Sequence, residues 1–376
     1  MNDFYNINTY LKNKQNELSV CNYNEADALV LAQLSYYPFE NFYQKDRKVS
    51  VPELARKIME GPDFYSYSKD KQTFIKELMN CKRYARCIIH NMQSVSTPDT
   101  RWAAFTMDFR TGNTSAIAMR GTDKTTVGWA EDFRLGYNVM GTGAQLASFR
   151  YLKETKARKI YLTGHSKGGN NVSSAFAMSA PNIRDKIIRI DNFDGPGVNP
   201  EFAYNYSDGY GELEGKLHNF YPEGSVIGLL LKDNPGEINF IKTQKREGYR
   251  NNMLLGQHNP FAWEIRDGFL VRTKQSCASE LLNHALDELM NITDSKQRYY
   301  LVQIIERMGI PAIISGEVHG VAAILTTAVC GYFEASREEK TALFYALVAF
   351  IKGFISQSKE WIAKPRTKEY NRIELL

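Results

Sequence analysis

Ser166 lies at the centre of the sequence GHSKG (residues 164–168), a Gly-x-Ser-x-Gly pattern typical of serine nucleophiles. The pattern is a weak signal by itself, but a short apolar run, residues 159–163, precedes it and a run of small residues follows it. A nucleophile elbow needs this strand–turn–helix context, because the flanking glycines allow a sharp, strained turn. The pattern predicts acyl transfer through Ser166, and a glycine-rich turn with a bystander serine is the alternative.

A serine nucleophile also needs backbone N–H groups that stabilise the oxyanion of the tetrahedral intermediate. One donor is the residue after the serine, Lys167, and the other comes from a loop after an earlier strand. The strand-like run at residues 115–119 leads into Arg120, Gly121 and Thr122. We therefore expect Thr122 to supply the second donor, whereas a simple strand-ending turn is the alternative.

An alternation of strands and helices must position these residues. Two strands joined by a tight turn are predicted for residues 101–109 and 114–122, followed by a helix at 144–157. Further strands are expected within residues 159–164, 185–197, 215–225 and 238–244. This order favours βαβ units and a mostly parallel sheet.

Helical patterns flank the alternating region on both sides. Residues 25–36 have apolar positions at helical spacing, and residues 50–95 are predicted to be helical with a break at residues 61–62. No strand pattern is found after about residue 276. The predicted organisation is an α/β domain with a helical N-terminal part at 1–275, and a helical C-terminal extension at 276–376.

Composition narrows the class of protein. The 376 residues are 43% hydrophobic and carry a net charge of +5 without a basic run, so no nucleic-acid partner is expected. The five cysteines are scattered, which indicates free thiols and a reducing, cytoplasmic location. We expect neither a signal peptide nor a transmembrane helix, because the most apolar segment, residues 311–333, contains Glu317 and His319 and is interpreted as a core helix.

Two motifs in combination resemble the class 3 (fungal-type) lipases. These are AIAMRGTDKTTVGWAEDF at residues 116–133 and YLTGHSKGGNN at residues 161–171. An uncharacterised bacterial branch of that superfamily is similar over about residues 18–270, through NEADALVLAQLSY, FDGPG, YPEGSVIG and QHNPFAW. The resemblance implies an α/β-hydrolase fold, a Ser-His-acid triad and hydrolysis of lipid or other carboxylic esters.

The resemblance also implies roles for single residues. Ser166 corresponds to the nucleophile and Thr122 to an oxyanion residue. Trp129 and Asp132 match a Trp-x-x-Asp element. We expect that element to be structural, with Asp132 capping a helix or pairing near Arg120.

The triad base is assigned to His258. In α/β-hydrolases the order along the chain is nucleophile, acid, histidine. His258 follows the last strand-like segment in a loop with glycine and proline, and it matches the family's histidine position. His165 is adjacent to Ser166 and is excluded by geometry. The remaining histidines lie upstream, in a strand pattern or on helical patterns: His90, His218, His284 and His319.

The acid is less well defined by the sequence. The position that matches the family's aspartate holds Ser225, and the nearest carboxylate is Glu223. Asp194, at the end of the previous strand, is the alternative acid, and Asp191 is a poorer candidate because it precedes the strand end. We favour Glu223 narrowly over Asp194. A dyad oriented by a backbone carbonyl or by Ser225 also remains open.

These residues predict a serine hydrolase for a small ester or lipid substrate. No metal or organic cofactor is expected, and the oligomeric state is left open. A thioesterase or peptidase on the same elbow and a non-catalytic, hydrolase-like binding protein are the alternatives. The aromatic-rich segment at 124–148 is a candidate lid or acyl-pocket wall, with plain packing as the alternative.

Overall fold

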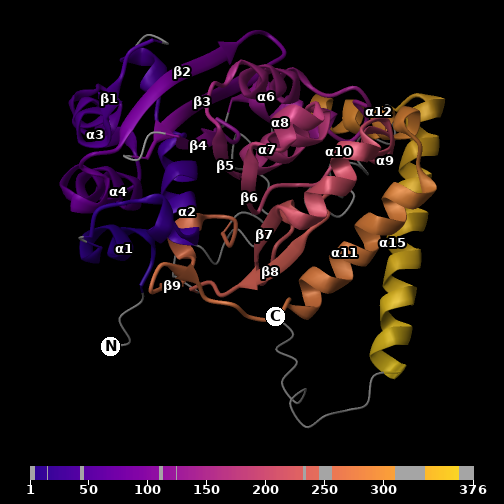
Figure 1. Ribbon diagram of the computed structural model, residues 1–376. Coiled ribbons are helices and arrows are strands. Elements are labelled where there is room, and N and C mark those ends of the chain that lie inside the picture. Colours follow the sequence, from indigo (N-terminus) through magenta and orange to yellow (C-terminus); the bar gives the residue numbers. More distant parts are fainter. Residues whose placement is uncertain are drawn as a thin grey trace.

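An eight-stranded sheet forms the centre of the computed structural model (Figure 1). The structure describes residues 5–14, 16–42, 46–109, 113–123, 125–231, 234–244, 256–309 and 335–363. The strands follow one another across the sheet in chain order, with antiparallel pairing from β1 to β4 and parallel pairing from β4 to β8. Their bounds are β1 Val49–Ser50, β2 Ile88–Ser96, β3 Arg101–Asp108, β4 Thr114–Met119, β5 Lys159–His165, β6 Ile187–Phe193, β7 Leu217–Pro222 and β8 Glu237–Ile241.

The helices that connect the parallel strands cover one face of this sheet. Strands in sequential order with right-handed crossovers place all their connections on the same side. There the strands bury an apolar cluster that includes Leu162 and Ile190 against Val172 and Phe176. The connecting helices are α5 Thr126–Arg134, α6 Gly143–Glu154, α7 Lys167–Met178, α8 Pro181–Arg184, α9 Pro200–Asn205 and α10 Ser207–Glu212. This mostly parallel sheet flanked by helices is the α/β-hydrolase architecture that the sequence predicts.

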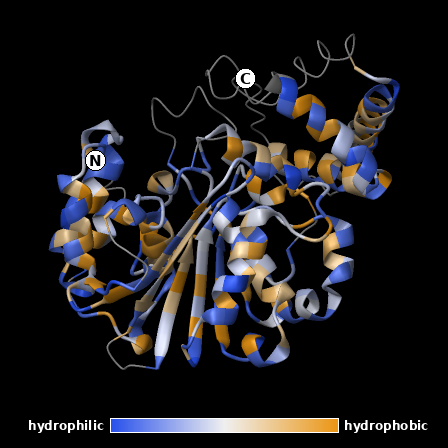
Figure 2. Cartoon of the chain, turned by 90° about the horizontal axis from the view of Figure 1, so that it is seen from above, coloured by the Kyte–Doolittle hydropathy of each residue, from blue (hydrophilic) through white to orange (hydrophobic). Residues whose placement is uncertain are grey.

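The opposite face of the sheet is covered by the N-terminal helices. Helix α2 (Glu25–Leu34) packs on β5, and all ten of its residues are buried between the sheet, α1 (Ile7–Asn13) and the short strand β10 (Phe269–Leu270). Helices α3 (Val51–Glu60) and α4 (Lys69–Asn80) pack against each other, and α4 also packs on α1. Figure 2 shows helices on both sides of the strands. The C-terminal end of α2 thereby reaches the carboxyl edge of the parallel strands.

One element of the predicted organisation is wrong. Residues 50–95 are not helical throughout, because residues 88–96 form β2 and pair with β3 in antiparallel orientation. The segment IIHNMQSVS has buried residues at 89 and 92 and mostly polar residues elsewhere, which suits an outer strand with one covered face. The expected break at residues 61–62 is confirmed, since α3 ends there.

Long helices form the C-terminal part of the chain. They are α11 Cys277–Ile292, α12 Ser295–Ile304 and α15 Arg337–Ala363, and α11 and α15 lie side by side (Figure 1). Arg298 of α12 joins them to the α/β part, because its guanidinium donates to the carbonyl of Gly136 over 2.6 Å and pairs with Glu201. Residues 311–333, interpreted above as a core helix, lie outside the described residues, and the division at residues 275–276 stays a prediction.

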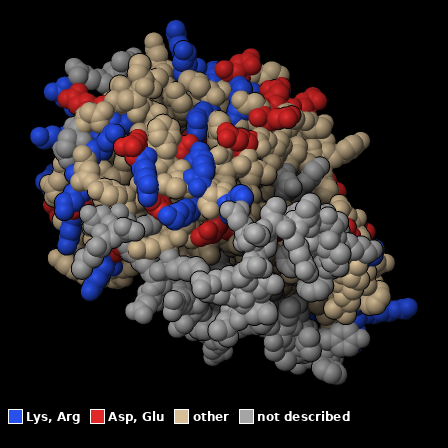
Figure 3. All heavy atoms as spheres, turned by 90° about the horizontal axis from the view of Figure 1, so that it is seen from below, with Lys and Arg blue, Asp and Glu red and all other residues tan. Residues whose placement is uncertain are grey.

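The structure also bears on the surface charge, on membrane spans and on the cysteines. Basic and acidic side chains are interspersed on the face in Figure 3. No helix among the described residues has the length and apolar character that crossing a membrane requires. Four cysteines among the described residues are free thiols: Cys21, Cys81, Cys87 and Cys277. Cys330 lies outside the described residues.

Candidate active site

Ser166 occupies a sharp turn between β5 and α7. Its backbone has φ +59° and ψ −133°, a strained conformation for a residue with a side chain. The glycines on either side are required by space: a Cβ at Gly164 would lie 2.2 Å from the carbonyl carbon of Gly168, and a Cβ at Gly168 would lie 2.2 Å from the carbonyl oxygen of Met119. The turn therefore has the geometry of a nucleophile elbow, with the serine at the carboxyl edge of the sheet.

The side chains of His258 and Asp194 form a hydrogen bond beside this elbow. The distance from His258 Nδ1 to Asp194 Oδ2 is 2.7 Å, and the two side chains are 15% and 1% exposed. Asp194 follows β6 directly, and its φ of +51° turns it out of the strand direction. Its Oδ1 accepts hydrogen bonds from the Ser225 hydroxyl over 2.5 Å and from the Gly228 amide over 3.1 Å. The carboxylate is thus held in one orientation, and its bond to Nδ1 leaves Nε2 as the basic nitrogen of His258.

The loop that carries His258 is anchored by its neighbours. The indole of Trp263, a fully buried side chain, donates to the carbonyl of Gln257 over 2.7 Å. The side-chain oxygen of Gln257 in turn accepts from the Gly224 amide over 2.7 Å. The sequence QHNPFAW therefore holds the histidine from both sides, which explains why tryptophan and glutamine accompany it.

The preference for Glu223 over Asp194 disagrees with this geometry. Glu223 accepts a hydrogen bond from the Thr243 hydroxyl over 3.1 Å, and the structure pairs His258 with Asp194 instead. Asp191 lies within β6 and pairs with Arg189 over 2.7 Å. Ser225, which occupies the position expected for the acid, supports Asp194 through its hydroxyl. The resemblance pointed to the end of β7, which Glu223 and Ser225 follow. The carboxylate that pairs with His258 instead follows β6.

His165 links the elbow, the His258 loop and helix α2. Burial, and next to it the neighbouring His258, lowers the pKa of His165 well below its ordinary value, so this imidazole is neutral. Its Nε2 lies 2.9 Å from the carbonyl oxygen of His258, which can only accept, so Nε2 carries the proton. Nδ1 then accepts from the Tyr36 hydroxyl over 2.8 Å.

Tyr36 is a residue of this site that the sequence analysis did not single out. Burial raises the pKa of the Tyr36 hydroxyl above its ordinary range, Asp132 adds to the rise, and the Ser166 hydroxyl opposes it. The hydroxyl that holds His165 therefore also lies beside Ser166. Its signal in the sequence is its place at the end of NEADALVLAQLSY, a motif used above only for the resemblance.

The strand end that carries Thr122 is close to the elbow. A Cβ at Gly121 would lie 2.0 Å from the Tyr36 hydroxyl oxygen and 2.5 Å from the carbonyl oxygen of His165. The Thr122 hydroxyl donates to Asp132 Oδ2 over 2.5 Å. The structure thus brings Thr122 to the neighbourhood of Ser166, where its backbone N–H is expected to act.

Arg120 has a different partner from the one expected. Its guanidinium forms two bonds with the carboxylate of Glu40, over 2.6 and 2.7 Å, and donates to the carbonyls of Ser35 and Tyr37. Asp132 therefore pairs not with Arg120 itself but with the hydroxyl of Thr122, two residues further along the chain. Arg120 instead fixes the chain after α2, the segment that positions Tyr36.

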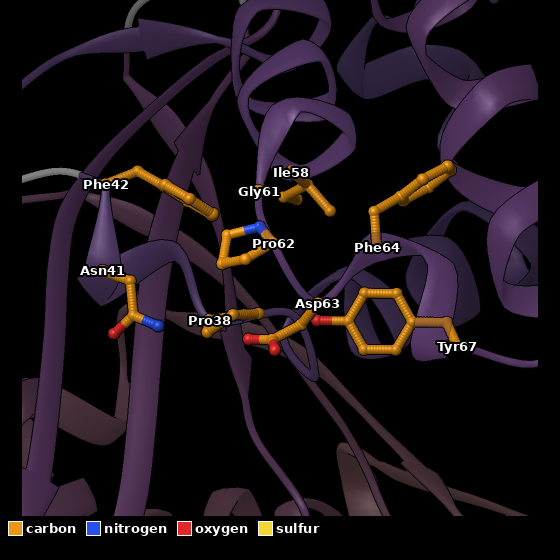
Figure 4. Close-up of a pocket in the computed structure, with 9 residues that line it drawn as sticks. All are labelled: Pro38, Asn41, Phe42, Ile58, Gly61, Pro62, Asp63, Phe64 and Tyr67. Atoms are coloured by element: carbon orange, nitrogen blue, oxygen red, sulfur yellow. The ribbon is translucent and has the colours of Figure 1, made fainter.

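A cavity of about 260 Å³ lies along the same segment after α2 (Figure 4). Aromatic, proline and aliphatic side chains make up most of its wall, and Asp63 is its single charged lining residue. The ring of Tyr67 in the wall contacts the ring of Tyr37 at a centroid distance of 5.2 Å. The cavity is thus linked to the candidate site through Tyr37, the residue after Tyr36 in the chain.

The segment at 124–148 packs on the C-terminal helices, and Lys124 lies outside the described residues. Tyr137 contacts Tyr299 of α12 edge to face at 5.2 Å, whereas Met140 is 60% exposed. The role of the segment at 124–148 as a lid or acyl-pocket wall stays a prediction. Among the described residues, no group of three or more His, Cys, Asp and Glu side chains could hold a metal ion.

The sequence matches the Mbeg1-like family over residues 66–306, which is more than half of the chain. The chain belongs to the Mbeg1-like family. No curated protein matches it. The match supports the lipase-like superfamily, and the bacterial branch stays a prediction.

Several solved lipase structures are distantly similar. Lipase II from Rhizopus niveus is 16% identical, with a TM-score of 0.27, over 37% of this chain and 60% of that chain. The native Rhizomucor miehei lipase propeptide complex is 15% identical, with a TM-score of 0.29, over 49% and 65%. A deletion mutant of that complex is 14% identical, with a TM-score of 0.32, over 70% and 78%. The chain thus spans less than two thirds of the first two structures.

Proposed function

We propose that this Mbeg1-like protein is a serine hydrolase of carboxylic esters, lipid esters included. Ser166 is the nucleophile, His258 the general base and Asp194 the acid. The observation that carries the proposal is the 2.7 Å bond between His258 Nδ1 and Asp194 Oδ2 next to a serine with φ +59°. An elbow serine, a histidine and a buried carboxylate are the parts that acyl transfer needs.

The reaction begins with proton transfer from Ser166 to His258 Nε2 as the serine oxygen attacks the ester carbonyl carbon. Asp194 keeps the proton of His258 on Nδ1 and stabilises the imidazolium that forms. Because Asp194 is 1% exposed and held by two further donors, it does this without reorganisation.

The tetrahedral oxyanion is bound by the backbone N–H groups of Lys167 and Thr122. His258 then gives its proton to the leaving alcohol, and the acyl group stays on Ser166. Water, deprotonated by His258, attacks the acyl-enzyme, and the carboxylic acid leaves as Ser166 regains its proton. The aromatic cavity beside Tyr37 is the candidate subsite for an apolar part of the substrate.

The first test is labelling of the purified protein with a fluorophosphonate, which forms a covalent bond only with an activated serine. Wild type is expected to be labelled, and Ser166→Ala and His258→Ala are expected not to be. A folded wild type that stays unlabelled would move the assignment to a non-catalytic binding protein. A panel of p-nitrophenyl esters, thioesters and peptides then separates the esterase from a thioesterase or peptidase.

A second pair of variants tests the acid. Asp194→Asn is expected to slow labelling at least about a hundredfold, because the imidazole loses its orienting carboxylate. Glu223→Gln is the matched control and is expected to react like wild type, since Glu223 contacts Thr243. The reverse ranking would return the acid to Glu223.

The cytoplasmic location expected from the cysteines stays a prediction.

A further inference from the structure

The residue after the elbow serine has a buried, charged side chain. Lys167 and Glu131 are each 1% exposed, and Lys167 Nζ lies 2.9 Å from Glu131 Oε2. The ammonium also donates to the carbonyl of Arg101 over 3.0 Å. Its third neighbour is Asp132, whose Oδ1 lies 3.8 Å away. Burying a charge costs several kcal/mol unless partners compensate it, so a lysine at this position calls for an explanation beyond packing.

Glu131 is held by backbone donors. Its Oε1 accepts from the Ala144 amide over 2.7 Å, and its Oε2 accepts from the Arg101 amide over 3.2 Å as well as from Lys167. An ammonium group has three donors, and Glu131 and the Arg101 carbonyl use two of them. Asp132 Oδ1, at 3.8 Å, is a charged neighbour of the ammonium beyond hydrogen-bond distance.

The Oδ1 oxygen of Asp132 is the one that faces the Lys167 ammonium. Asp132 Oδ2 accepts the Thr122 hydroxyl, whereas Oδ1 is buried and has no hydrogen-bond partner among the residues that the structure describes. Burial raises the pKa of Asp132 to about 6, Lys167 opposes this rise, Glu131 adds to it and His258 lowers it. Tyr36 is a further titratable neighbour, since Asp132 raises the pKa of its hydroxyl.

The protonation state of Asp132 decides what Thr122 can do. An ionised carboxylate only accepts, so the Thr122 hydroxyl must donate to it and the residue has one orientation. A protonated Asp132 can donate instead, which releases this constraint. The residue expected to offer a backbone N–H to the oxyanion is therefore fixed by an anion, and that anion faces the buried ammonium of Lys167.

We propose that Lys167 is a positioning residue for the oxyanion site, whose ammonium keeps Asp132 ionised so that Asp132 holds Thr122 in place. The inference rests on the proposed function and adds to it an electrostatic control. Lys167 thus has two roles. Its backbone N–H binds the oxyanion, and its side-chain ammonium acts on Asp132, which holds Thr122.

The test is the rate of fluorophosphonate labelling of Ser166 as a function of pH, because the phosphonate oxygen occupies the oxyanion position. Lys167→Met removes the charge and keeps the length of the side chain. Without the ammonium, Asp132 takes up its proton at higher pH, so the acid-side midpoint is expected to rise by about one pH unit or more. Lys167→Gln, which is neutral but polar, should give the same shift if Lys167→Met does not fold.

Two controls separate charge from structure. Glu131→Gln removes the opposite charge from the same buried pair, so its midpoint should not rise above that of wild type. Adding Asp132→Asn to Lys167→Met removes the titrating carboxyl and should return the midpoint to the wild-type value. Labelling that falls equally at all pH values, or a midpoint that rises in both Lys167→Met and Glu131→Gln, would overturn the inference. An unlabelled wild type would instead overturn the proposed function.

Discussion

At the scale of single residues, one neutral imidazole connects the parts of the candidate site. His165 donates to the backbone carbonyl of His258 and accepts from the Tyr36 hydroxyl. Its ring also lies against that of His258, at a centroid distance of 4.5 Å. The position of His258 over the elbow therefore depends on a tyrosine from the N-terminal part of the chain.

Tyr36→Phe is predicted to leave Nδ1 of the buried His165 without its donor. The unpaired nitrogen is expected to cost about 1–3 kcal/mol of unfolding free energy and to slow labelling of Ser166, because His165 no longer holds the His258 loop in one position. Tyr37→Phe is the matched control, since the Tyr37 hydroxyl donates to the Lys71 carbonyl over 2.8 Å. It should lower stability by a similar amount, as measured by urea unfolding, without changing the labelling rate. Equal labelling rates in both variants would contradict the role of Tyr36.

The site residues differ in how far the sequence could define them. Ser166 is recognisable because its requirements are local: two glycines, a strand before it and a helix after it. The narrow preference for Glu223 over Asp194 disagrees with the structure, because both residues follow strands and the choice depends on which one lies opposite His258 in space. Tyr36 was missed for the same reason, since it is 129 residues away from His165 in the chain.

At the scale of elements, a buried ionic cluster joins the N-terminal helices. The Arg83 guanidinium forms two bonds with the Asp27 carboxylate of α2, over 2.7 and 2.6 Å, and both side chains are 0% exposed. The hydroxyls of Tyr10 and Tyr84 donate to the same carboxylate. The cluster connects α1, α2 and the turn after α4, and so fixes the helix whose end carries Tyr36.

Asp27→Asn is predicted to lower the unfolding free energy by about 3–5 kcal/mol, because it leaves Arg83 buried without a counter-charge. Glu60→Gln breaks the exposed pair with Lys57 and should leave stability nearly unchanged, because an exposed ion pair contributes little. Urea unfolding of both variants measures the contrast. A small effect of Asp27→Asn would mean that the N-terminal layer is held by apolar packing alone.

The elements themselves were largely predictable, and the exception has a clear cause. Helix α7 and the strands β3 to β8 follow from apolar runs bounded by glycine, proline and polar turns. The segment of β2 is predicted as helix from the sequence because it follows two real helices and has polar residues at His90, Asn91 and Gln93. Its pairing with β3 decided its conformation, and pairing partners cannot be read from a single segment.

At the scale of the whole molecule, the candidate site makes stability depend on pH. The folded protein keeps His165 neutral, because its pKa is well below the ordinary value, whereas the unfolded chain takes up a proton near pH 6.5. The unfolded state therefore binds more protons as the pH falls, and the unfolding free energy decreases. Asp132 acts in the opposite direction, because its folded pKa of about 6 exceeds its unfolded value, so the folded protein takes up this proton first as the pH falls toward 6 and below.

Between pH 7 and pH 6 the two groups therefore act against each other, and comparison with a variant that lacks the imidazole separates the contribution of His165. Its contribution to the unfolding free energy is expected to fall by about 0.7 kcal/mol across that range, the amount for one group that titrates only in the unfolded chain. His165→Gln should be less stable overall but should lose this part of the slope. Urea unfolding of both proteins at the two pH values gives the comparison. An unchanged slope in His165→Gln would mean that His165 titrates alike in the folded and unfolded protein, which would contradict the neutral imidazole assigned between Tyr36 and His258.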